Sequence, residues 1–421
     1  MLTAISNAFR VPELRKKILF TLAMIALYRL GAFIPVPGVD INKVAALLSQ
    51  NQALGLLGLF SGGALEKLAV FSLGIMPYIT SSIIMQLLQG VIPKVEQWSK
   101  EGETGQRKIT QITRYMTLGI ALLESLGLLA TFRAALSTGP GSPPLWFTQL
   151  VIVITLIAGT AFIMWMGELM TQHGIGNGMS LLIFASIVSR FPQAIVQSLA
   201  FGSGLLTFVL IGAVLLIVAA IVTMERAQRR IPVQYAKRVV GRRVYGGSGT
   251  YIPLKINGAN VVPIIFASAI LFFPSQIAAL TKIPWLIQVG AALQAGPINW
   301  VAEFALIVFF TYFYTALIFN PIDLSDNLRK NGGFIPGVRP GSATTRYIEN
   351  VLNRITLPGA LFLGVIAILP NVLIHEFGFS QATARGLGGT SILIVVGVAL
   401  DIMRQMESQL TMRHYEGFLS K

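Results

Sequence analysis

The chain contains no cysteine, and its three histidines, His173, His375 and His414, are not spaced as a metal-binding pair. Without thiols it forms no disulfides and performs no cysteine chemistry, and the ligands that most often build zinc sites are scarce. The sequence also lacks the phosphate loop Gly-x-x-x-x-Gly-Lys, the zinc-protease motif His-Glu-x-x-His and the nucleophile elbow Gly-x-Ser-x-Gly. We therefore expect no active site, no cofactor and no enzymatic activity.

Charged side chains are also few, at 12% of the residues against 54% hydrophobic residues. They gather in connectors between ten apolar stretches, which we place at residues 17–35, 70–92, 108–132, 145–170, 178–199, 204–224, 256–280, 300–319, 353–375 and 387–406. A helix needs about 20 apolar residues to cross a bilayer, where each backbone polar group must be satisfied internally. The sequence therefore predicts an all-α membrane protein with ten transmembrane helices.

The positive charges indicate how these helices are oriented. Lys and Arg number 32 against 17 Asp and Glu, and most of them lie at the N-terminus and in every second connector. Because basic connectors stay on the cytoplasmic side, both termini are predicted to be cytoplasmic. Arg15, Lys16 and Lys17 precede an apolar run as in a signal peptide, but no small-residue cleavage site follows, so we expect a retained first helix.

One apolar region, residues 53–92, is too long for one crossing and too short for two. Ser61-Gly62-Gly63 and the charged pair Glu66-Lys67 interrupt it, and consecutive glycines break a helix readily. We interpret it as a half-helix at about 55–68 followed by a full crossing. Broken segments at membrane depth are tolerated where they face protein or a water-filled cavity, so this one is predicted to line a pore or binding site. The alternative is a re-entrant loop with a purely structural role.

Ten crossings divide into two halves of five, which we place at residues 1–200 and 201–421. With an odd number of helices in each half, the second half must be inverted in the membrane, and inverted repeats commonly hold a functional path at their interface. An inverted-repeat secondary transporter is the alternative function, although such a transporter needs convergent polar groups at the midplane. An intramembrane aspartyl protease is a third possibility.

Seven motifs resemble, in the same order along the chain, those of the SecY family, whose members are the central subunits of the bacterial Sec protein-conducting channel, or translocon. They are YRLGAFIPVPG (28–38), FSGGAL (60–65), LGIMPYI (73–79), GIGNG (174–178), QRRIPV (228–233), GFIPGVRPG (333–341) and GTSILIVV (389–396). The resemblance implies a clamshell of two inverted five-helix halves. It also implies a channel that translocates unfolded secretory polypeptides and releases transmembrane segments laterally into the bilayer.

The resemblance further implies a ring of aliphatic side chains at the waist of the pore and a plug below it. The ring residues are Ile75, Ile79, Ile183, Ile187, Ile265 and Ile394, and the plug residues are Phe60, Ser61, Gly62, Gly63, Ala64 and Leu65. An apolar ring suits a channel for varied polypeptides, because it needs no specific hydrogen bonds and a narrow apolar neck excludes water and ions. Taken singly, an isoleucine in a membrane helix is normally a packing or lipid contact.

Three polar residues within the crossings, Gln86, Glu124 and Asn257, match family positions that face a lateral gate between helices 2, 3, 7 and 8. A polar group at membrane depth is costly and usually faces a cavity or a partner. The family commonly has an uncharged polar residue where this chain has Glu124. The alternative is a local hydrogen bond between helices, without a role in gating.

The loops 225–255 and 321–346 are long and basic, and in the family such loops dock the ribosome, through ribosomal RNA, and the SecA motor ATPase. The residues expected to make these contacts are Arg238, Arg242, Arg243, Arg339 and Tyr415. Basic loops next to a membrane also arise as topology signals or as contacts with anionic membrane lipids. The resemblance adds the SecE and SecG small membrane subunits, signal peptides and nascent chains as partners, and the bacterial plasma (inner) membrane as the location.

Overall fold

The computed structural model describes residues 11–50, 58, 60–136, 143–199, 204–235, 238–240, 243–245, 250–281, 283–294, 296–375 and 386–419. The elements of the first half are α2 (Pro12–Gly31), α3 (Ile41–Gln50), the 3₁₀-helix η1 (Leu65–Lys67), α5 (Met76–Val91), α6 (Pro93–Lys100), α7 (Glu103–Thr131), the 3₁₀-helix η2 (Arg133–Ala135), α8 (Leu145–His173), α9 (Gly178–Val188) and α10 (Phe191–Leu199).

The second half combines long helices with five short strands. Its elements are α11 (Gly204–Arg226), β1 (Gln228–Tyr235), β2 (Arg238–Val240), β3 (Arg243–Tyr245), β4 (Thr250–Lys255), α12 (Val262–Thr281), α13 (Pro284–Gln294), α14 (Gly296–Ile318), α15 (Pro321–Lys330), β5 (Gly333–Phe334), α16 (Ser342–His375) and α18 (Gly389–Leu419).

Each of the ten predicted crossings falls on a helix or on a pair of consecutive helices. Within the described part of the chain, six segments are long and apolar enough to cross a membrane; they comprise α7, α8, α9 with α10, α14 with α15, α16 and α18. The remaining predicted crossings correspond to α2, α5, α11 and α12. The protein is therefore a multi-pass, predominantly helical membrane protein.

Several helix ends differ from the predicted bounds for physical reasons. The predicted crossing 178–199 divides after Val188, because Pro192 has no N–H to donate to the carbonyl of Val188 in a continuous helix. The crossing predicted from residue 70 becomes helical only at Met76, and the residues before it are turns. We call the end of the molecule that carries the basic connectors the basic end. At this end α7, α16 and α18 extend beyond the bounds that hydropathy predicts, because water-exposed helical turns are polar.

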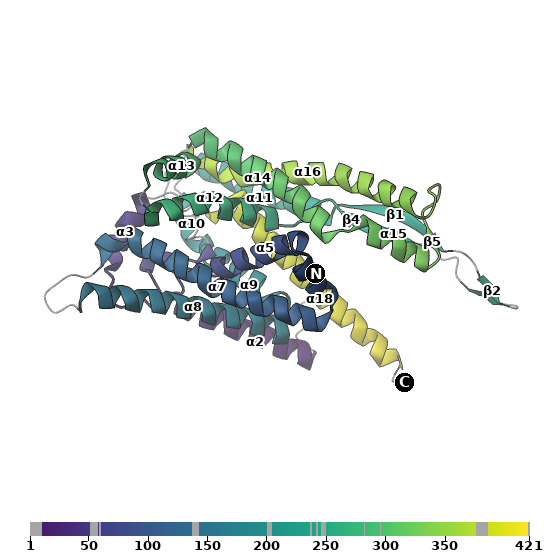
Figure 1. Ribbon diagram of the computed structural model, residues 1–421, viewed down its shortest axis with the longest axis horizontal. Helices are drawn as coiled ribbons and strands as arrows, with labels where there is room; N and C mark the ends of the chain where they lie inside the picture. Colours follow the sequence, from purple (N-terminus) through teal and green to yellow (C-terminus); the bar gives the residue numbers. More distant parts are fainter. Residues whose placement is uncertain are drawn as a thin grey trace.

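The two halves meet along two lines (Figure 1). On one side α12 of the second half packs against α7 and α5 of the first half, and on the other side α18 packs against α9. Within the first half α7 packs on α5 and α8, and within the second half α14 packs on α12 and α16. In Figure 1 the second half lies above the first, and α18 runs between them toward the C-terminus.

The connector 225–255 forms a β-hairpin rather than an irregular loop. Strand β1 pairs antiparallel with β4 from Gln228–Lys255 to Val233–Thr250, and its far end pairs with β5. Alternate residues of the hairpin are buried, among them Ile231 and Val233, and they pack with Leu328 of α15 and Ile348 of α16. The sheet, the hairpin tip β2–β3 and the C-terminus all lie at the right-hand end of Figure 1.

Candidate functional site

The six predicted ring isoleucines belong to one hydrophobic cluster, which joins the two halves. Five of them, Ile75, Ile183, Ile187, Ile265 and Ile394, are at most 7% exposed, and Ile79 is partly buried against them. They come from α5 and the residue before it, α9, α12 and α18, which are the helices along the two lines where the halves meet. Ile75 and Ile79, like Ile183 and Ile187, are four residues apart and so share one helix face.

The predicted plug residues belong to this same cluster. Phe60, Ala64 and Leu65 are buried with the isoleucines, and Ser61 is fully buried beside them. Over residues 61–68 the chain forms turns and the 3₁₀-helix η1 rather than an α-helix, while residues 55–57 and 59 lie outside the described residues. A continuous helix is impossible there, because Gly62 and Gly63 have φ angles of +61° and +90°.

Backbone hydrogen bonds fix this segment to the end of α2. Val36 donates its N–H to the carbonyl of Leu68 at 2.9 Å, and Val70 donates to the carbonyl of Ile34 at 2.9 Å. Within the segment the Ser61 hydroxyl donates to Gly58 and accepts the N–H of Leu65. The predicted plug segment is therefore a compact unit with its own hydrogen bonds, and its apolar side chains pack in the cluster where the two halves meet.

The three polar residues predicted at the lateral gate do not form one cluster. Glu124 is buried in the last turns of α7, whereas Asn257 directly follows β4 at the opposite, basic end of the molecule. The amide Nδ2 of Asn257 donates to Glu225 Oε1 at 2.7 Å, and Oδ1 of Asn257, Oε2 of Glu124 and Oε1 of Gln86 are buried without a hydrogen bond. Asn257 thus makes a local hydrogen bond to the end of α11, and the gating role of all three residues stays a prediction.

The helices at the seam nevertheless approach closely. α12 packs against α7 and α5, and a Cβ added to Gly90 of α5 would lie 3.3 Å from the Leu317 side chain of α14. The four helices α5, α7, α12 and α14 are therefore neighbours along one side of the molecule, in the arrangement that a lateral opening requires.

The residues predicted for partner docking lie at the basic end. Arg339 is exposed in the turn between β5 and α16, where its carbonyl accepts the hydroxyl of Thr344 at 2.8 Å. Arg238 and Arg243 lie in β2 and β3, and Tyr415 lies in α18, but only their backbone is described; Arg242 lies outside the described residues. The tip of the hairpin and the end of α18 thus extend from the same end of the protein as Arg339 (Figure 1).

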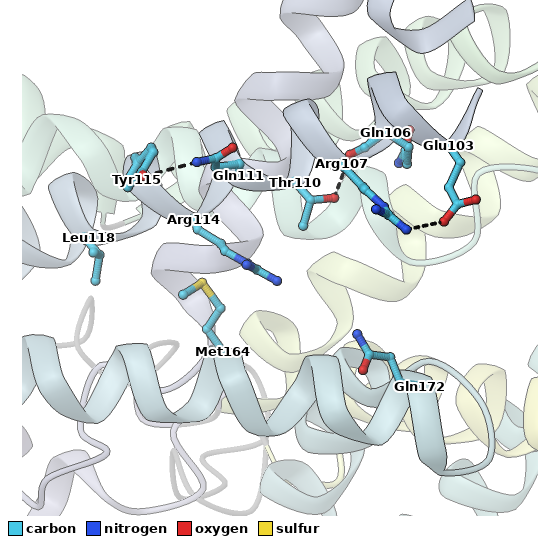
Figure 2. A pocket seen from close by; sticks show the side chains of 10 residues that line it. All are labelled: Glu103, Gln106, Arg107, Thr110, Gln111, Arg114, Tyr115, Leu118, Met164 and Gln172. Carbon is cyan, nitrogen blue, oxygen red and sulfur yellow. Dashed lines mark hydrogen bonds and ion pairs between the residues drawn. The ribbon is translucent and has the colours of Figure 1, made fainter. Parts of the chain in front are cut away.

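A pocket of about 710 Å³ between α7 and α8 was not predicted from the sequence (Figure 2). Its arginines are neutralised: Arg107 pairs with Glu103 at 2.7 Å, and Arg114 makes two hydrogen bonds to Glu168, at 2.8 and 2.6 Å. Complementary charges inside two neighbouring apolar stretches were the sequence signal for the Arg114–Glu168 pair. Since the carboxylates balance the arginines, the pocket offers no net charge to a ligand, and we assign it no role in transport.

Two inverted five-helix halves that meet in one apolar cluster, with a short non-helical segment packed into it, define a membrane channel. The family model of SecY matches residues 69–403. The protein translocase subunit SecY of Streptomyces galbus is 52% identical, over 100% of both chains. The chain belongs to the SecY family, whose members are protein-conducting channels and not enzymes.

Solved structures show the same fold at low sequence identity. One, of the SecY protein, describes a plug domain that stabilises the closed state of the translocation channel and maintains a membrane seal; it has a TM-score of 0.65 and 18% identity, with 96% of each chain covered. Another is Sec61 in the canine ribosome–channel complex from the endoplasmic reticulum, with a TM-score of 0.59, 17% identity and 96% of each chain covered.

Proposed function

We propose that this chain forms the pore through which unfolded secretory polypeptides cross the membrane. The observation that carries the proposal is the single apolar cluster in which the six isoleucines from both halves and the plug residues pack together. In the closed state this cluster excludes water. When the plug leaves, the isoleucine side chains form a deformable ring around the translocating polypeptide. Because this ring offers no hydrogen bonds, it discriminates little between substrate side chains.

The same arrangement supports lateral release of transmembrane segments. α12 separates from α5 and α7 more easily than helices within one half do, because the first half packs as one unit and the second half as another. Parting of the halves at this line exposes the pore to lipid, where a sufficiently apolar segment is more stable than in water. Gln86 and Glu124 lie on helices of this seam, where the cost of their buried oxygens in the closed state would favour opening.

The energy for transport by this chain must come from a partner, since the sequence contains no nucleotide-binding motif. Partners also deliver the polypeptide to the channel. We propose that the hairpin, the Arg339 turn and the end of α18 dock the ribosome and the SecA motor ATPase in turn, with SecE and SecG as accompanying membrane subunits. The basic surface suits ribosomal RNA, because lysine and arginine neutralise phosphates. The ribosome-bound structure of Sec61, which shares the fold, supports a ribosomal partner.

We place the protein in the bacterial plasma membrane with both termini in the cytoplasm. The basic end of the structure includes the hairpin and the C-terminus, and by the positive-inside rule that end faces the cytoplasm. The bacterial relative of similar length supports this location.

Transport of polypeptides, rather than of small solutes, is tested by reconstitution. Vesicles containing this chain, its small subunits and the motor ATPase are expected to take up an unfolded secretory precursor and protect it from added protease. An inverted-repeat transporter would instead accumulate a small solute against a gradient and leave the precursor outside. Failure to protect any precursor, with intact and correctly oriented protein, would contradict the proposal.

Reversing the charge of the docking residues is expected to weaken binding without disturbing membrane insertion. Arg238→Glu and Arg243→Glu should each lower ribosome affinity about tenfold at low salt, and the loss should shrink as salt rises, because counterion release makes such binding salt-dependent. Arg339→Glu should impair transport more than binding, because a turn rich in Gly and Pro presents this side chain at a fixed place. Binding titrations at two salt concentrations measure the loss of ribosome affinity, and transport assays measure the defect of the Arg339 variant. Unchanged affinities would leave the basic residues as topology signals.

A further inference from the structure

Two arginines hold the plug from the first half of the protein. Arg29 lies in the last turn of α2, and Arg190 lies between α9 and α10. These residues are far apart in the sequence, and both side chains reach the segment that contains Gly62 and Glu66. Each binds the plug in a different way, one through its backbone and the other through a side-chain carboxylate.

Arg29 anchors the plug backbone. Its Nη1 donates to the carbonyl of Gly62 at 2.9 Å and to the hydroxyl oxygen of Ser189 at 2.9 Å. The Ser189 hydroxyl in turn donates to the carbonyl of Ser186 at 2.6 Å. The Tyr28 hydroxyl and the Ser186 hydroxyl form a further hydrogen bond of 2.7 Å. The end of α2, the end of α9 and the plug are therefore joined by one polar network.

Arg190 binds the plug through charge. Its Nη2 lies 2.9 Å from Glu66 Oε1, and the arginine side chain is 15% exposed against 45% for the glutamate. Both guanidinium groups lie beside the Gly62–Gly63 turn: a Cβ added to Gly62 would lie 3.1 Å from Arg29 Nη1, and one added to Gly63 would lie 3.8 Å from Arg190 Nη2. Two positive charges beside adjacent residues of one turn repel each other. Glu66 is the plug carboxylate that offsets this positive charge. If the plug leaves, Arg190 loses its partner and the two arginines face each other without it.

We propose that the Glu66–Arg190 ion pair is an electrostatic clasp that holds the plug closed, with Arg29 as its backbone anchor. The inference rests on the proposed function of residues 60–68 as a plug. Because Glu66 is nearly half exposed, water screens the pair, and the clasp holds the plug weakly enough for an entering polypeptide to displace it. The apolar contacts of Phe60 and Leu65 supply the seal, and the clasp sets how often the closed channel opens by itself.

Charge reversal in both partners tests the clasp. Glu66→Arg and Arg190→Glu should each raise the resting ion conductance of reconstituted channels about fivefold, a change typical of losing a partly exposed pair. The double variant, Glu66→Arg with Arg190→Glu, restores opposite charges and should return conductance to within about twofold of the original protein. Lys43→Glu is the matched control, because Lys43 of α3 pairs with Asp40, the residue before this helix, and α3 packs beside η1. The conductance of this control variant should not change.

Salt provides a second readout that does not depend on a charge reversal. Raising ionic strength should increase the resting open probability of the original channel, and Glu66→Gln should abolish this dependence. A double variant as leaky as the single variants, or single variants as tight as the original protein while a deletion of residues 60–68 leaks, would overturn the clasp and leave the plug intact as a proposal. A deletion that does not leak would overturn both.

Discussion

Deletion of residues 60–68 is expected to leave a folded channel whose resting ion conductance rises at least about tenfold, which corresponds to about 1.4 kcal/mol in the equilibrium between closed and open states. The deleted segment supplies Phe60, Ala64 and Leu65 to the cluster that fills the junction of the halves, so its loss leaves the isoleucine ring as the remaining barrier. Planar-bilayer recording of single channels measures the change directly.

The control for this deletion is a deletion elsewhere in the first half of the sequence. Removing residues from 137–142, which lie outside the described residues and between η2 and α8, should not alter conductance. A plug deletion as tight as the original protein would mean that the ring alone seals the pore, and that the segment has the purely structural role considered from the sequence.

Replacement of a ring isoleucine by asparagine is expected to relax the signal-sequence requirement. Ile394 is 1% exposed and Ile265 is 5% exposed, so Ile394→Asn or Ile265→Asn loses apolar burial and adds an amide to the closed waist. The cost is about 3 kcal/mol, enough to shift the ratio of closed to open channels about 100-fold. Cells that carry either variant should export proteins with defective signal sequences, which an export assay with a mutated precursor measures.

Two isoleucines close in sequence to Ile394 and Ile265 serve as matched controls for these asparagine variants. Ile392 and Ile264 are 4% and 2% exposed, but they pack in the core of the second half and not in the cluster at the waist. Ile392→Asn and Ile264→Asn should therefore reduce thermal stability to a similar extent without relaxing the signal requirement. If both pairs of variants behave alike, the ring isoleucines have a packing role only.

The sequence predicts the crossings well because hydropathy depends on local composition, and lipid requires long apolar helices whatever their neighbours are. The predicted ring isoleucines pack in or against one cluster, since residues four apart share a helix face wherever the helix lies, but their role as a pore ring stays a prediction. The hairpin was missed, although Ile231 and Val233 on β1, and Ile252 and Leu254 on β4, occupy every second position, as the residues on one face of a strand do. The basic residues between them made the segment look like a solvated loop.

Contacts between distant residues could not be predicted from such patterns. Glu66 and Lys67 are adjacent in the sequence, yet Glu66 pairs with Arg190, and the Lys67 ammonium lies 3.8 Å from the centroid of the Phe33 ring. Asn257 was expected at the seam, but its amide bonds to Glu225, because the hairpin brings the end of α11 and the start of the α12 segment together. The Glu66–Arg190 and Asn257–Glu225 contacts both depend on which distant segments the fold brings together, and local composition does not encode this.

Helix α18 runs between the basic end of the protein and the waist. It runs from Gly389 to Leu419, and Arg404 near its middle donates to the backbone carbonyl of Glu225 at the base of the hairpin, at 3.2 Å. Ile394 lies ten residues before Arg404, a distance of about 15 Å along the helix. A tilt of α18 by about 4° about the Arg404 contact would therefore move Ile394 by about 1 Å, so a partner that shifts the far end of this helix would displace a side chain at the waist.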